Sequence, residues 1–230
     1  MPLSLTPSPS QLGARCDADV VSSCVQVCHP ADMTADSPSS IAPDTFIVTF
    51  HVRSPSTTAS NSDTAGGTSF SFQIHVTKED APYAAQRFYN LARASCSENG
   101  DDGKEKGEGS VYSNSFSFFG GQRFYRVVPG WVVQFGVSGT PAVSAIYQHT
   151  NDVPGAIIPA DPVRKTNGMG TVAFSAAYSA EGMACNQTSE LFINLADNAK
   201  ELDARGFAPF GSISRDDMEL ITAAGMYQPN

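Results

Sequence analysis

A short apolar segment in the middle of the chain carries a single arginine. It reads FYRVVPGWVVQFG over residues 124–136. Its aromatic and branched side chains favour β-structure, and Pro129-Gly130 favours a turn inside it. A lone cation such as Arg126 is costly to bury among such residues unless its charge is used. The plainer interpretations are an arginine at a strand edge or one half of an ion pair, but the cost of an idle buried cation favours a functional Arg126.

Composition limits the class of protein. With 230 residues the chain can form one domain with a substantial core, plus tails. It contains no apolar run long enough to span a bilayer, so a membrane protein is not expected. The formal net charge of −9 argues against nucleic acid as a partner, because phosphates would be repelled at long range.

The cysteines and the N-terminus bear on metal binding and location. Five cysteines form an odd set without the spacing of a disulfide framework. Cys24, Cys28 and His29 could offer thiolate and imidazole ligands, but they have no matching second half, so free thiols in a tail are the preferred interpretation. We expect a reducing, cytoplasmic compartment. Residues 1–12 lack a continuous apolar core but contain Ser and no acid, which leaves organellar targeting open.

The chain divides into an extension and one domain. Residues 1–43 are rich in Ser, Pro, Ala and Asp, and they predict a disordered extension. The domain is expected over residues 44–230. It begins with two strands of alternating polarity, at 45–52 and 70–76, separated by a polar insertion near 54–68.

The rest of the domain is expected to be mainly β with a helix near each end. Asp80 predicts the start of a helix that ends near Arg93, and a charged, Gly-rich insertion follows near 95–115. Residues 124–213 alternate β-prone runs with turns, which suits a barrel better than βαβ units. The box Ser214-x-x-Asp217 predicts a final helix.

Three ordered blocks resemble the cyclophilins, the peptidyl-prolyl cis-trans isomerases. They are the segment 124–136, TSELFIN at 188–194 and GFAPFG at 206–211. The resemblance implies a cyclophilin-like antiparallel β-barrel with two flanking helices. In that family one more strand normally follows the second helix and closes the sheet. Here the chain stops at Asn230, so that strand is either missing or supplied by another segment.

The resemblance also implies isomerase activity on proline-containing peptides, without metal or organic cofactor. Rotation of an X-Pro bond has a barrier of about 20 kcal/mol and passes through a twisted amide, whose nitrogen becomes basic. A cation aimed at that nitrogen stabilises the transition state selectively. By resemblance Arg126 is this cation, and Gln134 orients it or the peptide. The implied substrate-binding residues are Trp131, Val132, Ser175, Ala176, Glu190, Phe192, Leu202 and Phe207.

Three positions depart from the family pattern. Glu190 is a carboxylate where an amide is common, and Ala176 replaces a common Asn. Lys200 or Glu201 stands where many relatives carry the Trp that holds cyclosporin, so cyclosporin binding is expected to be weak. The alternative function is therefore a proline-peptide-binding module with weak or no turnover. A more distant alternative is an inert barrel with a metal-binding tail. A monomer is expected.

Overall fold

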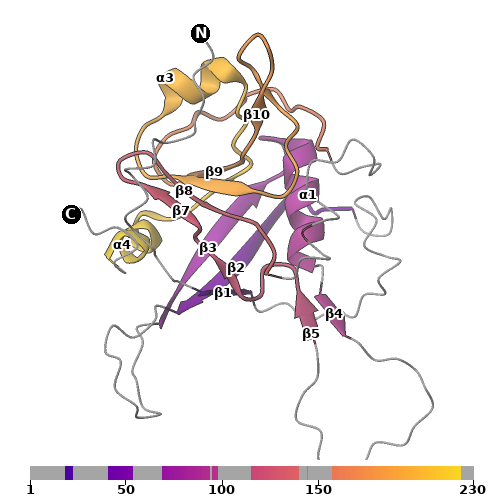
Figure 1. Cartoon of the computed structure of the whole chain (residues 1–230), viewed down its shortest axis with the longest axis vertical. Helices are drawn as coiled ribbons and strands as arrows, with labels where there is room; N and C mark the ends of the chain where they lie inside the picture. The colour runs from indigo at the N-terminus through magenta and orange to yellow at the C-terminus, as the bar shows by residue number, and fades with distance from the viewer. Residues whose placement is uncertain are drawn as a thin grey trace, which may run out of the picture.

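The structure is a computed structural model that describes residues 19–22, 41–53, 69–93, 95–97, 115–139, 144 and 157–223. Its main element is an antiparallel sheet of nine strands in the order β6-β1-β2-β3-β13-β9-β12-β8-β7 (Figure 1). In chain order these strands are β1 (Asp19–Ser22), β2 (Thr45–Arg53), β3 (Ser69–Thr77), β6 (Gln122–Arg123), β7 (Arg126–Val128), β8 (Val132–Phe135), β9 (Thr171–Phe174), β12 (Leu191–Asn194) and β13 (Gly211–Ser212).

Smaller elements surround this sheet. Two short hairpins are formed by β4 (Ser95–Ser97) with β5 (Ser115–Ser117) and by β10 (Ala177–Tyr178) with β11 (Ala184–Cys185). The helices are α1 (Pro82–Arg93), α3 (Ala199–Leu202), the 3-10 turn η3 (Asp203–Arg205) and α4 (Arg215–Ala223). In the described part of the chain, no helix combines the length and the apolar character that crossing a bilayer requires.

The predicted pair of alternating strands is confirmed. β2 and β3 pair without interruption from Thr45 opposite Thr77 to Arg53 opposite Ser69. Every second side chain points inward, so Val48, Phe50 and Val52 are buried on β2 and Phe72, Ile74 and Val76 on β3. This alternation is the period of two that a sheet with one buried face requires.

The sheet curls until its two edge strands, β6 and β7, are separated in the chain only by Phe124 and Tyr125. β1 lies between β2 and β6, with Asp19 opposite both Arg53 and Arg123. Of the two alternatives for the closing strand, supply by another segment therefore fits. β1 falls within 1–43, where composition predicted disorder. Its sequence, DVVS, contains two β-branched residues, which favour a strand. A composition averaged over residues 1–43 hides this short run, because Ser and Pro dominate the segment.

Several sequence expectations lie outside the described residues. They are the rest of the 1–40 segment, with Cys24, Cys28 and His29, the insertion 54–68 and most of the insertion 95–115.

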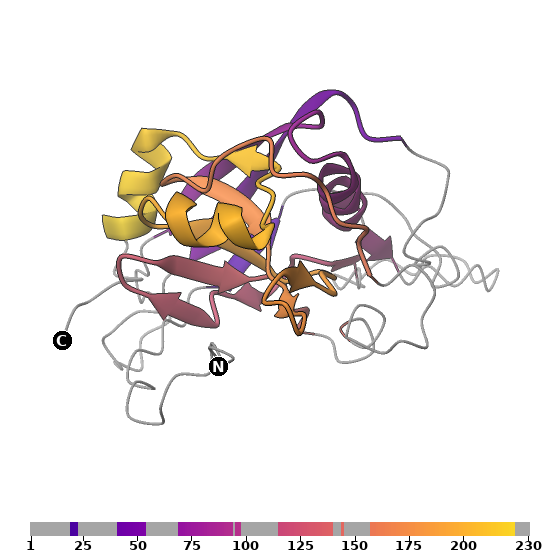
Figure 2. The same ribbon diagram turned by 90° about the horizontal axis from the view of Figure 1, so that it is seen from above.

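The helices α1 and α4 flank the curled sheet (Figures 1 and 2), and both contribute buried side chains to its core. The predicted capping of α1 by Asp80 is wrong, because Asp80 instead lies 3.1 Å from the Lys165 ammonium. The first-turn amides of Tyr83 and Ala84 donate to the buried carboxylate of Asp161, at 3.2 and 2.8 Å. At α4 the prediction is confirmed, since the Asp217 amide donates to Ser214 Oγ at 3.1 Å.

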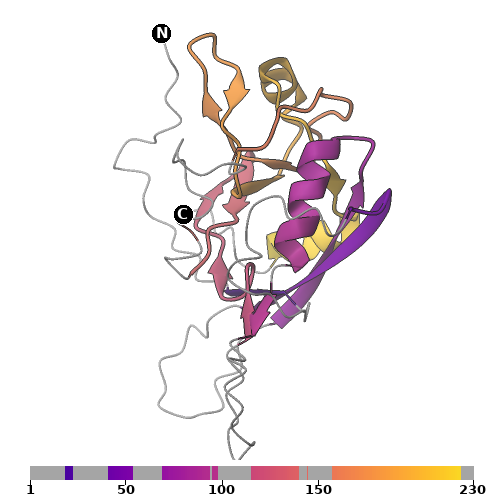
Figure 3. The same ribbon diagram turned by 90° about the vertical axis from the view of Figure 1, so that its right-hand side faces the viewer.

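Phenylalanine rings fill the space inside the curl. The fully buried members are Phe50, Phe72, Phe88, Phe118, Phe119, Phe124, Phe135, Phe174 and Phe210. They contact one another in stacked and edge-to-face pairs, such as Phe50 and Phe72, with centroids 5.1 Å apart. Figure 3 shows α1 lying along the long strands β2 and β3, where Phe88 closes this core.

A second apolar cluster is separate from this core. Its buried members are Val132, Ala173, Phe192, Leu202 and Phe207. Because side chains alternate, β8 turns Val133 and Phe135 into the main core and Val132 toward the second cluster. The inner face of the sheet thus packs the main core. The outer face, over β8, β9 and β12, carries the second cluster and is available for a site.

Candidate active site

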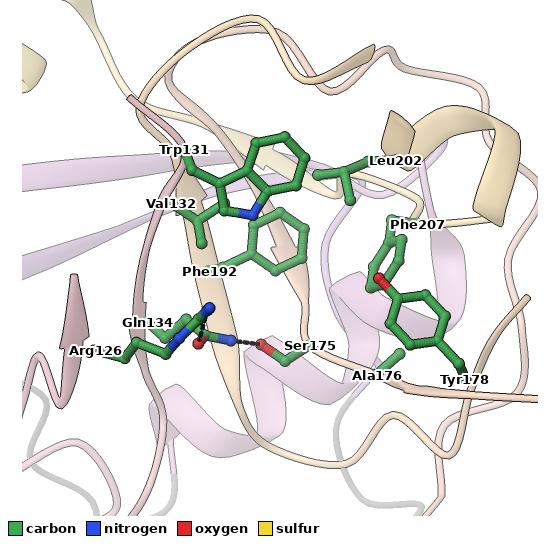
Figure 4. A pocket seen from close by; sticks show the side chains of 10 residues that line it. All are labelled: Arg126, Trp131, Val132, Gln134, Ser175, Ala176, Tyr178, Phe192, Leu202 and Phe207. Atoms are coloured by element: carbon green, nitrogen blue, oxygen red, sulfur yellow. Dashed lines mark hydrogen bonds between the residues drawn. The ribbon is translucent and has the colours of Figure 1, made fainter. Parts of the chain in front are cut away.

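The second cluster is the floor of an open pocket with about 350 Å³ of empty space (Figure 4). The lining residues are Arg126, Trp131, Val132, Gln134, Ser175, Ala176, Tyr178, Phe192, Leu202 and Phe207.

Strand register explains why these side chains meet. Phe192 on β12 lies opposite Gln134 on β8 and opposite Ala173 on β9. Arg126 on β7 in turn lies opposite Gln134. Directly opposed residues project from the same face of a sheet, so neighbouring strands deliver a cation, an amide and an aromatic ring to one surface.

The guanidinium of Arg126 is held in a fixed direction. Its Nη1 donates to Gln134 Oε1 at 2.7 Å, and Gln134 Nε2 donates to Ser175 Oγ at 2.9 Å. Both contacts are partly buried, and within the described residues no carboxylate forms an ion pair with Arg126. The charge of Arg126 is thus oriented without being neutralised, which is what electrostatic catalysis requires of a cation.

Aromatic rings form the opposite wall. Phe192 and Phe207 meet edge to face with centroids 5.7 Å apart, and Tyr178 meets Phe207 in the same way at 6.0 Å. Trp131 packs against this cluster, and its carbonyl accepts hydrogen bonds from Leu195 N and Asn198 Nδ2, at 2.8 and 2.9 Å. The pocket therefore joins an apolar slot to one oriented cation.

A buried amide network supports the floor of the pocket. Asn194 is fully buried; its Nδ2 donates to Asn167 Oδ1 and Thr171 Oγ1, and its Oδ1 accepts from Asn198 Nδ2 at 2.7 Å. Asn167 Nδ2 also donates to the carbonyl of Phe207 at 2.8 Å. These bonds tie the loop that carries Phe207 to the sheet beneath it.

Asp203 also belongs to this network. It lies in the 3-10 turn η3, shortly before the pocket residue Phe207. Desolvation opposes its ionisation, but hydrogen bonds from the Thr166 hydroxyl and from the side chain and main chain of Asn167 outweigh that effect and lower its pKa. The ionised carboxylate is thus part of the folded structure.

All the residues that the resemblance implied line this pocket, except Glu190. The Glu190 carboxylate accepts a hydrogen bond from the Tyr125 hydroxyl at 2.8 Å, and it does not pair with Arg126. Desolvation raises the pKa of Tyr125, the charge and the hydrogen bond of Glu190 raise it further, and the charge of Arg126 acts the other way. Tyr125 and Glu190 therefore form a separate pair within electrostatic reach of Arg126.

Tyr178 was not predicted from the sequence. It lies on the hairpin β10–β11, outside the three blocks that carry the resemblance. The only local signal is an aromatic residue in a short run between turn residues, and such a run is not specific.

In the described part of the chain, no group of three or more His, Cys, Asp or Glu side chains is placed to hold a metal ion.

The outer face of a curled antiparallel sheet thus carries an apolar slot beside an oriented arginine. The chain belongs to the cyclophilin type peptidyl-prolyl cis-trans isomerases, since the family model described as "Cyclophilin type peptidyl-prolyl cis-trans isomerase/CLD" matches residues 63–226. The predicted family and the predicted mainly β fold class are confirmed.

Among solved structures, the chain is similar to a cyclophilin type peptidyl-prolyl cis-trans isomerase from Cryptosporidium parvum. The two share 13% sequence identity and a TM-score of 0.44, over 70% of this chain and 81% of the other. No curated protein matches the chain.

Proposed function

We propose that this chain is an active peptidyl-prolyl isomerase and that Arg126 stabilises the twisted X-Pro amide. The family acts on X-Pro bonds and binds proline-containing peptides. The proposal for this member rests on one observation. The Arg126 guanidinium lies at the edge of an apolar slot, held by Gln134 at 2.7 Å and not neutralised by any described carboxylate.

The pocket supports this chemistry without a nucleophile. The slot between Trp131, Phe192 and Phe207 suits a pyrrolidine ring, because it is apolar and aromatic. As the amide twists, its conjugation is lost and the prolyl nitrogen gains a basic lone pair. The guanidinium of an arginine is a cation with a fixed fork of donors, which Arg126 can direct at that lone pair. The interaction is stronger in the transition state than in the ground state, and this difference is what accelerates rotation.

Substitution of Arg126 tests the proposal. Removal of one well-placed donor costs about 2.7–4 kcal/mol in other enzymes, so Arg126→Ala should lower kcat/KM about 100- to 1,000-fold while the protein stays folded. Arg215→Ala is the matched control, since this arginine lies on α4 with 91% of its side chain exposed. Isomerisation of a proline tetrapeptide is followed by protease-coupled or NMR-exchange assay, with folding checked by circular dichroism. Equal rates in the parent and Arg126→Ala proteins would refute the role of Arg126.

Two positions favour the alternative of a binding module. Ala176 lines the pocket without the amide that is common there, and Glu190 places a carboxylate near Arg126. If the parent protein binds a proline peptide by calorimetry but does not accelerate its isomerisation, the binding module is the better description.

A further inference from the structure

The hairpin β10–β11 places a tyrosine at the pocket. Tyr178 lies opposite Ala184 in the hairpin register, and the turn is closed by bonds from Ser179 N to Met183 O at 2.8 Å and from Gly182 N to Ser179 O at 2.9 Å. The hairpin and α3 occupy the same end of the molecule (Figures 1 and 3). In Figure 4 Tyr178 lies across the pocket from Arg126, and its hydroxyl end is directed toward Phe207.

An arginine stacks on this tyrosine. The guanidinium carbon of Arg205 lies 5.3 Å from the centroid of the Tyr178 ring, within the range of a cation–π contact. Arg205 ends η3, and the turn after it is fixed by Gly206 at φ +82° and by a bond from Phe207 N to Leu202 O at 3.2 Å. Arg205 is thus anchored two residues before Phe207, which lines the pocket.

No carboxylate in the described part of the chain forms an ion pair with Arg205. A guanidinium that lies over an aromatic ring keeps the N–H groups of its edge available, and these groups match the geometry of a carboxylate. An arginine held in this way loses little side-chain freedom when it binds an anion.

We propose that Tyr178 and Arg205 form a subsite beside the proline pocket that accepts an acidic side chain of the bound peptide. The inference rests on the proposed function in one respect, that a proline peptide occupies the pocket. Tyr178 supplies the platform and Arg205 the charge. The subsite lies on the wall opposite Arg126, so it selects substrates without entering the chemistry of rotation.

The direction of the substrate preference distinguishes this subsite from the effect of the protein's overall charge. The formal net charge is −9, and by itself it would disfavour acidic peptides. A preference for an acidic peptide over its neutral isostere therefore has to come from a local cation. Glu and Gln have nearly the same shape, so a pair of peptides that differ only in this residue isolates the charge.

The test uses tetrapeptide pairs with Glu or Gln placed directly before proline in one series and directly after it in the other. We expect the parent to favour Glu by about two- to fivefold in kcat/KM in at least one series, the range of a partly exposed charge pair. Arg205→Gln should bring that ratio to one or below. Arg215→Gln, the same change on exposed α4, should leave it intact. Added salt should reduce the ratio in the parent, because screening weakens such a contact.

The role of the Tyr178 ring has its own test. Tyr178→Phe keeps the platform and should retain most of the preference, whereas Tyr178→Ala should lose it.

The subsite is wrong if the parent shows no Glu preference in either series, or if Arg205→Gln keeps the preference. If no peptide is isomerised, the preference for Glu over Gln is measured instead as a ratio of Kd values by calorimetry. A protein that isomerises peptides without preferring Glu contradicts only the subsite. A protein that prefers Glu but isomerises no peptide contradicts only the proposed function.

Discussion

The side-chain nitrogen of Gln134 donates a hydrogen bond to the hydroxyl of Ser175 at 2.9 Å. The direction of this bond follows from the other end of the amide. Arg126 can only donate, so the Gln134 oxygen has to face Arg126 and the nitrogen has to face Ser175. Arg126 therefore determines which way the Gln134 amide faces, and Ser175 holds the other end of that amide in place.

Removal of the Ser175 hydroxyl should weaken catalysis more than binding. A hydrogen bond of this kind contributes about 0.5–1.5 kcal/mol, so Ser175→Ala should lower kcat about two- to tenfold and change KM little. Ser175→Thr keeps the hydroxyl and should restore most of the rate. Steady-state kinetics on the three proteins separate the two constants. A fall in stability with no change in kcat would show that the bond has only a structural role.

The pair of Tyr125 and Glu190 should affect the rate in opposite directions. Glu190→Gln removes a negative charge near Arg126, so kcat/KM should rise modestly. Tyr125→Phe removes the donor that holds the carboxylate, and kcat/KM should fall, because Glu190 can then turn toward Arg126. In Glu190→Gln the Tyr125 hydroxyl should also ionise at lower pH, which an ultraviolet titration against Tyr125→Phe detects. Rate changes of the same sign would contradict this description of the pair.

Asp203 should make the protein sensitive to acid. Its pKa is lower in the folded state than in the unfolded chain, so its contribution to stability is present above the unfolded pKa and is lost as pH falls through the folded pKa. Asp203→Asn can keep the bonds to Thr166 and Asn167 but cannot titrate. We expect Tm to fall less steeply toward acid pH in Asp203→Asn than in the parent.

The control for this experiment is Asp216→Asn on the exposed face of α4. Asp161 has a pKa that is raised, first by desolvation, and it contributes a slope of the opposite sign. The comparison is therefore made as the difference in Tm between parent and variant at each pH. A difference that does not change with pH would show that Asp203 is not the group responsible.

Gly136 should tolerate no side chain, in contrast to Gly121. Both have positive φ, +102° and +65°, and alanine at such an angle costs about 1–2 kcal/mol. A Cβ on Gly121 would meet nothing within 4 Å, whereas one on Gly136 would overlap Ser189 O and lie 2.9 Å from Glu190 Cα. Gly136→Ala should therefore cost about 3 kcal/mol or more. Urea unfolding of both variants measures the difference, and equal costs would contradict the close approach.

Local patterns predicted the parts of the fold that repeat with a short period. The alternation in β2 and β3 and the apolar segment at 124–136 placed strands and core correctly. Contacts between distant residues were not predictable in this way. The cap on α1 comes from Asp161, more than seventy residues beyond the amides that it accepts from. Ser175 and Gln134 are 41 residues apart, and Glu190 meets Tyr125 rather than Arg126.

Two further features were hidden by their surroundings. β1 is a four-residue strand inside a Ser- and Pro-rich stretch, and it pairs with the distant strands β2 and β6. Tyr178 belongs to a hairpin outside the segments that resemble the family, so no motif marked it. In both cases the missing information was which distant residues the segment contacts in the fold, and composition does not encode such contacts.

The position of Arg126 has a consequence for how the protein matures. Arg126 and Gln134 face each other in the local hairpin β7–β8, but the pocket around them is completed by Ser175, Phe192 and Phe207, which lie 41 or more residues beyond Gln134. Pairings of long sequence separation form late, because their loop entropy is lost before the contacts compensate it. The chain contains fifteen prolines, and we expect that it cannot assist their isomerisation in its own folding molecule. A freshly made copy would then depend on spontaneous rotation, or on a copy that has already folded, and refolding should accelerate as native protein accumulates.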